Sequence, residues 1–480
     1  MFEDMHRLSG TKQKLIISVF LPWVLSMLFG GSPLISFNIA WLGSFFIFYC
    51  SILSPIRCVS TDASNSKRAM RPIVLLQLVF AGFMCSTSIF YFLDHLGYEF
   101  FTDVNRRNFV VNTTTYQLAN CQRYYVLAHA CLVAGLVIAS RQQITVSYVL
   151  SRKSDSALIK ASVISFMVSV LLSKLPAFVQ FSLMLRYVAE FGATLILVKG
   201  LHGKNVRMVL FGGGFFLYNL LSSSLTGYKE GVIIKVIILF FILLPYYKKQ
   251  VLALCLPTML ILFYILPTLA TTIRANVWTG DATSEQARNV VYQTLISADP
   301  LDEISNTNWI FLEDRFSEIG MFTQYVSFVP FQHDYYTSEI LGNSLAALIP
   351  RALWENKPDT EKLSMQRVYD SGVVNRLSDV SAKTRPIVDG YLAGGTVGIC
   401  IVMLVYGLTA QAICNQAERM FGGYETGCII VFNGIFQQLW RGNNLEFLIN
   451  NVFYGYLLML FLFQVLKRFD VLSPVEPQDQ

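Results

Sequence analysis

The 480-residue chain is too apolar to be an ordinary soluble protein. Hydrophobic residues make up 54% of it, aromatic residues 14% and charged residues only 14%, whereas soluble domains are typically about a quarter charged. Its net charge of +6 comes mostly from short loops between apolar segments, which favours membrane topology and lipid contact over nucleic-acid binding. We therefore expect an all-α, polytopic membrane protein that binds membrane lipid, no nucleic acid and no cofactor.

Apolar segments recur along the chain, and a membrane span needs about 20 predominantly apolar residues. The segments predict twelve spans, at 13–30, 33–53, 72–93, 124–141, 157–173, 176–199, 206–224, 231–247, 250–271, 387–411, 423–440 and 446–466. The spans divide the chain into a membrane domain at 1–271 with nine spans, a large loop at 272–385, a membrane domain at 386–468 with three spans, and a tail at 469–480.

The loop charges predict the orientation, because cytoplasmic loops carry an excess of Lys and Arg. With the amino terminus inside, every short cytoplasmic connection is basic, while the short outer connections carry only Lys174, Lys229 and Arg441. The expected outer segment from 94 to 123 adds Arg106, Arg107 and Arg123. Both termini and the 469–480 tail are thus predicted to be cytoplasmic and the 272–385 loop extracytoplasmic, away from ATP and nucleotide sugars.

Cysteine chemistry is not expected to be central. Of nine cysteines, Cys121 is the one that falls in an expected outer loop, so no pair is available there for a disulfide, and none has zinc-ligand spacing.

The 272–385 loop reads as a folded, mostly helical cap. Its apolar runs at 308–316 and 321–331 are expected to pack together or to lie in the membrane interface. Fifteen acidic residues against ten basic ones leave the loop with a net charge of −5. Any anion site in it must therefore be local.

The sharpest motif in the loop is SLAALIPRALWENKP at 344–358. A helical turn there would bring Arg351, Trp354 and Lys357 to one face, between two prolines that restrict the backbone. Arginine presents a rigid fork of donors to phosphate, and tryptophan can stack on a sugar ring. The same residue types also suit an interfacial tryptophan with cations reaching the membrane surface, and the motif alone leaves both readings open.

The IPRALWENKP run resembles a signature of the O-antigen and oligosaccharide repeat-unit polymerases, the Wzy-type enzymes of bacterial surface polysaccharide synthesis. Three further segments are similar to that family in the same order, namely 222–249, 313–322 and 388–407, with Lys229 where arginine is commoner. The resemblance covers 222–407 well and the amino-terminal half only by hydropathy.

The resemblance implies a fold similar to the type C glycosyltransferases and a metal-independent transfer of a glycan in the bacterial inner membrane. The growing glycan would leave undecaprenyl pyrophosphate for a lipid-linked repeat unit on the periplasmic face, with a chain-length regulator as a further partner. Twelve spans also suit a lipid-linked oligosaccharide flippase, although no internal repeat is visible. An O-antigen ligase of the same broad architecture is the other alternative.

That reaction leaves a pyrophosphate anion, so its site needs fixed cations at the membrane surface. We expect Arg315 and Arg351 to contact the pyrophosphate. Glu318 either pairs with Arg315 or takes the acceptor proton, and His333 is the second choice for that base. Substrate-binding residues are expected at the outer ends of helices and in the loop motif: Arg274, Lys229, Arg385, Arg441, Trp354 and Lys357.

A charged pair lies inside the sixth expected span. Arg186 and Glu190 are four residues apart, and unpaired charges in a membrane cost several kcal/mol, so we expect them to pair. Arg186 would then line a groove for the lipid carrier or the glycan. A purely structural ion pair between helices accounts for the spacing equally well.

Overall fold

The computed structural model describes residues 2–54, 69–96, 114–141, 144–150, 154–175, 178–224, 229–244, 247–255, 257–258, 317–350, 353–354, 356–376 and 382–475. Within these ranges the chain is built from helices and one short two-stranded antiparallel sheet, in which β1 (Tyr148–Leu150) pairs with β2 (Leu472–Pro474). The all-α class expected from composition is confirmed.

Eleven of the described helices lie between Phe2 and Leu243. Their bounds are α1 (Phe2–Leu28), α2 (Pro33–Phe48), η1 (Tyr49–Leu53), α3 (Pro72–Phe80), η3 (Ala81–Cys85), α4 (Ser88–His95), α6 (Thr115–Ala139), α7 (Ser154–Leu172), α8 (Val179–His202), α9 (Val206–Ser224) and α10 (Lys229–Leu243).

The remaining helices follow residue 316. They are α14 (Ile319–Phe328), α15 (Ser338–Leu348), α16 (Thr360–Asp370), α17 (Pro386–Met420), η7 (Tyr424–Phe432), α18 (Asn433–Ile435), α19 (Gln437–Arg441) and α20 (Leu445–Arg468). The described part of the 272–385 loop thus contains the three helices α14, α15 and α16.

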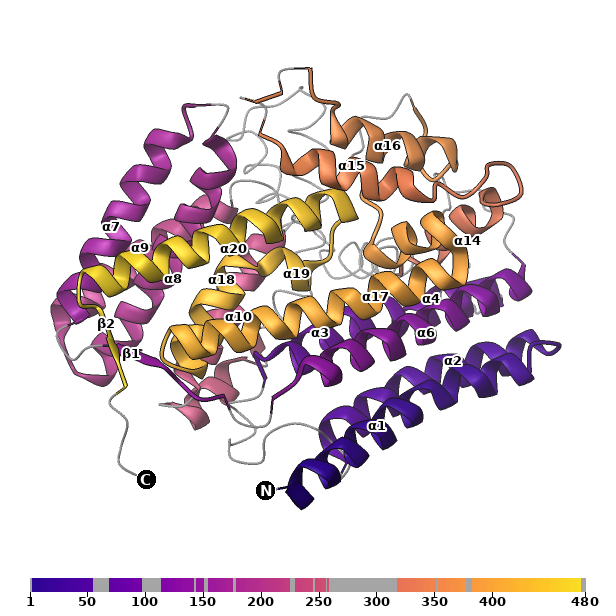
Figure 1. Cartoon of the computed structure of the whole chain (residues 1–480), viewed down its shortest axis with the longest axis horizontal. Helices are drawn as coiled ribbons and strands as arrows, with labels where there is room; N and C mark the ends of the chain where they lie inside the picture. Colours follow the sequence, from indigo (N-terminus) through magenta and orange to yellow (C-terminus); the bar gives the residue numbers. More distant parts are fainter. Residues whose placement is uncertain are drawn as a thin grey trace, which may run out of the picture.

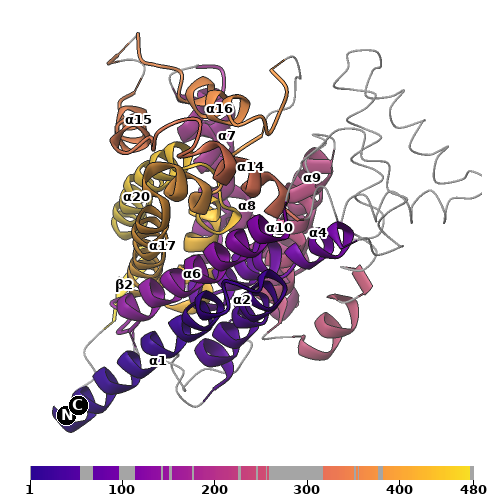
Figure 2. The same cartoon turned by 90° about the vertical axis from the view of Figure 1, so that its right-hand side faces the viewer.

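The long helices form a bundle with α6 at its centre. Helix α6 packs on α17, α2 and α1, and 89% of the residues in its most apolar stretch are buried. Helices α7, α8 and α9 stand together as a second group (Figure 1). Helices α14, α15 and α16 gather at one end of the bundle. The start of α1 and strand β2 lie at the other end (Figure 2).

Six helical segments in the described residues are long and apolar enough to cross a membrane. They are Pro33–Leu53, Pro72–His95, Thr115–Ala139, Phe181–Leu201, Pro386–Met420 and Leu445–Arg468, and two shorter apolar helices run at Leu158–Leu172 and Val206–Leu221. Most of the ninth expected span, 250–271, lies outside the described residues.

The fourth expected span starts earlier than its hydropathy indicates. Polar residues suggested a start near 124, but α6 begins at Thr115. A capping box fixes this start: the Thr114 hydroxyl accepts from the Gln117 N–H, and the Gln117 side chain accepts from the Thr114 N–H. The expectation that Arg123 and Cys121 lie in an outer loop is therefore wrong. Both residues are buried in α6.

The eleventh expected span is not one continuous α-helix. Residues 424–441 form the π-helical η7, which runs directly into α18, and then α19, which Phe436 separates from α18. Gly422 and Gly423 both have positive φ, at 83° and 86°, a conformation that suits glycine, and they turn the chain back from α17 into η7.

Helix α17 is interrupted near its start by a glycine pair. Gly394 and Gly395 have non-helical dihedrals, and a Cβ on Gly398 would lie 2.0 Å from the Gly390 carbonyl oxygen. Residues eight apart in a straight helix are about 12 Å apart. The first two turns of α17 therefore fold back onto the main helix, and this kink sets the direction of its amino-terminal end.

Candidate functional site

Arg385 stands immediately before α17 and forms a fork-shaped ion pair with Glu318. Its Nε lies 3.1 and 3.0 Å from the two Glu318 carboxylate oxygens, and its Nη2 lies 2.7 Å from Oε1. Pro386, at the first position of α17, favours the extended backbone that Arg385 adopts. Bidentate pairs of this kind are among the stronger hydrogen bonds in proteins.

Two further elements hold the Arg385 guanidinium. Its Nη1 donates to the Gly442 carbonyl at 2.7 Å and to the Arg441 carbonyl at 3.4 Å, and its plane lies over the Phe83 ring, 5.6 Å from the centroid. Gly442 has φ of 67°, so a side chain there would be strained. Arg385 is thus fixed from α14, η3 and the end of α19 at once.

An aromatic anchor fixes the helix that carries Glu318. Phe322, one turn into α14, is fully buried and packs against Tyr125 at 5.4 Å, Tyr391 at 5.8 Å and Tyr124 at 6.1 Å between ring centroids. The run at 321–331 therefore buries Phe322 and Tyr325 in the core, whereas Phe331 at its end is exposed. Glu318, at the N-cap of α14, consequently has a defined position.

A pocket opens beside the ion pair. Its polar wall is Arg385, Arg441 and Gly442, and its apolar wall comes from α3, η3, α17 and α19, with Leu76, Val79, Phe80, Phe83, Met84, Pro386, Met403, Tyr406 and Trp440. A volume of about 30 Å³ holds roughly two water molecules. The pocket can therefore take one end of an anionic group but not a whole glycan.

Arg441 connects this pocket to a charged cluster inside the helices. Its guanidinium lies 3.4 Å from the Gln437 side-chain oxygen, and it interacts electrostatically with Tyr187 on α8. Tyr187 follows Arg186, so the outer-end arginine and the arginine of the sixth expected span lie in one neighbourhood.

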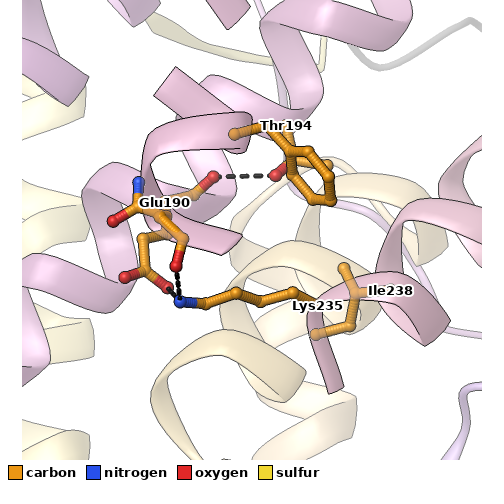
Figure 3. A pocket seen from close by; sticks show the side chains of 6 residues that line it. Glu190, Thr194, Lys235 and Ile238 are labelled. Atoms are coloured by element: carbon orange, nitrogen blue, oxygen red, sulfur yellow. Dashed lines mark hydrogen bonds and ion pairs between the residues drawn. The ribbon is translucent and has the colours of Figure 1, made fainter. Parts of the chain in front are cut away.

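The expected pairing of Arg186 with Glu190 is present, at 3.5 Å between Arg186 Nε and Glu190 Oε1. Lys235 of α10, which sequence reasoning did not single out, also pairs with Glu190, at 3.4 Å (Figure 3). Lys235 also donates to the Asn219 carbonyl at 3.0 Å. Because these residues come from α8, α9 and α10, the cluster ties three helices together.

A buried ion triad underlies the start of α17. Arg367 Nη2 lies 2.7 Å from Glu446 Oε1 and 3.4 Å from Asp389 Oδ1, and the three side chains are at most 2% exposed. Burial disfavours the charged guanidinium, but the two carboxylates outweigh this effect and raise the pKa of Arg367 above its usual value. Asp389 also accepts from the Leu445 N–H at 2.8 Å. The triad therefore joins α16, α17 and α20 one turn below Arg385.

The structure describes only part of the loop motif at 344–358. The Lys357 ammonium donates to the Ala347 and Ile349 carbonyls at 2.7 and 2.8 Å, so it caps the end of α15, and Trp354 is partly exposed. Arg351 lies outside the described residues. The proposed face of two cations and an indole is therefore described only in part, and Lys357 has a structural role in it.

The two candidate bases, Glu318 and His333, have separate sets of contacts. His333 is exposed on the turn after α14, its Nδ1 is 2.6 Å from the Asp334 carbonyl, and its ring stacks on Tyr336 at 4.4 Å. Glu318 pairs with Arg385, and its expected pairing with Arg315 falls outside the described residues. Arg315 and Arg274 lie outside the described residues, and Lys229 begins α10 with its side chain outside them.

The described residues define an all-α protein with helices suited to a membrane and an arginine–carboxylate site at one end of them. The chain belongs to the family described as a domain of unknown function (DUF8712), whose model matches residues 21–474. That match includes every residue of the site and of the charged cluster beside it. No curated protein and no solved structure matches the chain.

Proposed function

We propose that this chain is a polymerase of bacterial surface polysaccharide. It transfers a growing glycan from undecaprenyl pyrophosphate to a lipid-linked repeat unit at the outer face of the inner membrane. The observation that carries the proposal is a pocket between apolar helices that Arg385 and Arg441 line, with Glu318 paired to Arg385 beside it. The resemblance of the 313–322 and 344–358 segments to repeat-unit polymerases supports the same reaction.

The charges at the pocket suit the leaving group. Departure of a sugar from a lipid pyrophosphate leaves a multiply charged anion, which fixed cations stabilise more effectively than water does because they need no reorganisation. Arg385 already holds a carboxylate with its fork and is anchored from behind by Gly442. The same fork fits two phosphate oxygens. The apolar wall from α3 and η3 suits the polyprenyl chain next to the pyrophosphate.

Glu318 has a defined part in this reaction. An arriving pyrophosphate carries more charge than one carboxylate and competes with Glu318 for Arg385. Glu318, released from the pair, then takes the proton of the acceptor hydroxyl. The acceptor oxygen forms a bond to the anomeric carbon, the bond from that carbon to the pyrophosphate oxygen breaks, and its electron pair remains on the pyrophosphate.

The location of the site suits lipid-linked substrates. It lies near α14–α16, at the end of the bundle away from the start of α1 (Figure 2). The distribution of basic loops favours the extracytoplasmic side for this end, in a chain with about twelve spans and cytoplasmic termini. Substrates delivered across the membrane would reach the pocket laterally from the lipid.

Disruption of the gene in its own host distinguishes the proposal from its alternatives. Loss of a polymerase leaves surface lipid that carries single repeat units, whereas loss of a ligase leaves none and loss of a flippase retains the intermediates inside the cell. Restoration of long chains by the wild-type gene completes the test. Either of the other two phenotypes would refute the polymerase assignment.

A further inference from the structure

A second cluster of reactive side chains lies at the far end of α17 from Arg385. Cys414 and Glu418 are one helical turn apart on α17, and Cys428 approaches them from η7. The Cys414 Sγ is 3.5 Å from the Cys428 Sγ and 3.7 Å from Glu418 Oε1, and all three side chains are buried. In the part of the chain that the structure describes, this is the one group of three such side chains with metal-ligand spacing.

The backbone is shaped to bring the two cysteines together. The Gly422–Gly423 turn reverses the chain after α17, and a Cβ on Gly427 would lie 2.3 Å from the Ala417 carbonyl oxygen. Glycine at 427 therefore allows η7 to approach α17 closely, immediately before Cys428. The fourteen-residue separation of the cysteines is unlike a zinc-finger spacing, so the pair is recognisable only in the folded chain.

The separations match those between ligands of a tetrahedral metal ion. Zinc–sulfur bonds of about 2.3 Å and zinc–oxygen bonds of about 2.0–2.2 Å place tetrahedral ligands roughly 3.5–3.8 Å apart. The two observed separations are close to this range. A disulfide, in contrast, needs the sulfurs about 2.0 Å apart, so the two thiols would have to move well over an ångström. The Met70 carbonyl oxygen, 3.3 Å from the Cys428 Sγ, is a further oxygen at ligand distance from the group.

The charge at the cluster favours a divalent ion. Arg71 binds both Glu418 oxygens, with Nε at 2.9 Å and Nη2 at 2.8 Å, and each carboxylate oxygen keeps a second lone pair. Two thiolates and one carboxylate balance a divalent cation together with the Arg71 charge, which leaves the buried group neutral. A monovalent ion would leave a net negative charge in a buried place, which is costly.

We propose that Cys414, Glu418 and Cys428 form a binding site for a soft divalent cation of the zinc class, with Arg71 as the positioning residue for the carboxylate. Binding displaces one proton from each thiol to the solvent, and no electron is transferred. The site is structural. It joins the segment at Met70–Arg71, which precedes α3, to the end of α17 and to η7. Tyr424 of η7 and Asn433 at the start of α18 also contact Met70.

Metal content of the purified full-length protein tests the proposal. Protein prepared in detergent with excess zinc and then desalted should retain about one zinc per chain. The Cys414→Ser/Cys428→Ser variant should lose that zinc. A Cys50→Ser variant, which changes a buried cysteine in η1, should keep it. Arg71→Lys should weaken zinc binding by about 10–100-fold, because it removes the fork that orients Glu418.

A measurement on the wild-type protein guards against misfolding of the double variant. Cobalt(II) added to zinc-stripped wild-type protein should give the visible spectrum of a tetrahedral thiolate site, and zinc should protect Cys414 and Cys428 from alkylation until a chelator is added. No retained zinc in the wild type, full retention in the double cysteine variant, or a Cys414–Cys428 disulfide in the digest would each overturn the proposal.

Discussion

Replacement of Arg367 tests how much the packing below the site depends on one buried cation. Arg367→Met keeps most of the side-chain volume but leaves Asp389 and Glu446 buried near each other without the cation that lies 3.4 and 2.7 Å from them. Removal of one partner from a buried ion group typically costs about 3–5 kcal/mol, because the remaining charge stays buried. We expect a loss near the lower end, since one carboxyl can take up a proton.

The matched control is Arg376→Met. Arg376 pairs with Asp370 at the protein surface, with 63% of its side chain exposed, and such pairs contribute about 0–1 kcal/mol. Each variant is purified in detergent and unfolded by heat or denaturant. The loss of its monodisperse size-exclusion peak measures the unfolding. Equal stability of the two variants would refute the assignment of the triad as a structural requirement. A neutral Arg367→Met/Asp389→Asn/Glu446→Gln variant should recover most of the loss.

Three further changes have defined outcomes. Gly442→Ala places a side chain on a residue with positive φ, so it should lower the free energy of unfolding by about 1–3 kcal/mol and shorten the polysaccharide chains. Unchanged melting and chain length would argue that the Gly442 carbonyl does not hold Arg385 in place. Glu190→Gln leaves Lys235 without its carboxylate and should destabilise the purified protein by about 2–3 kcal/mol, which detergent melting can detect or exclude. An Arg315→Ala/Arg351→Ala variant should abolish polymer at normal abundance, and full-length polymer from it would remove both residues from the site.

Local sequence patterns predicted the positions of several helices and one ion pair within a helix. Apolar length located α2, α8 and α20 within a few residues, and the spacing of four predicted the pairing of Arg186 with Glu190. The predicted start of α6 was wrong because Gln117 and Arg123 lower the average hydropathy of its first turns. The capping box of Thr114 and Gln117 was the signal that could have corrected it.

The site itself depends on contacts between distant segments. Glu318 and Arg385 are 67 residues apart, and no periodicity relates them. The expectation of substrate-binding cations at helix ends had named both Arg385 and Arg441, and in the structure these two residues line one pocket. Lys235 and the Arg367 triad carried no local pattern and became recognisable only once helices α10, α16 and α20 were placed.

The most direct test of the proposed reaction is chain extension by the purified protein from defined undecaprenyl-pyrophosphate-linked repeat units, with products sized by mass spectrometry. The wild-type protein and Arg376→Ala should produce multi-repeat glycans. Arg385→Ala at equal abundance should be slower by about 100–1,000-fold, the usual loss when a fixed group that stabilises developing charge is removed. Undiminished extension by Arg385→Ala, or no extension by the wild-type protein, would contradict the account.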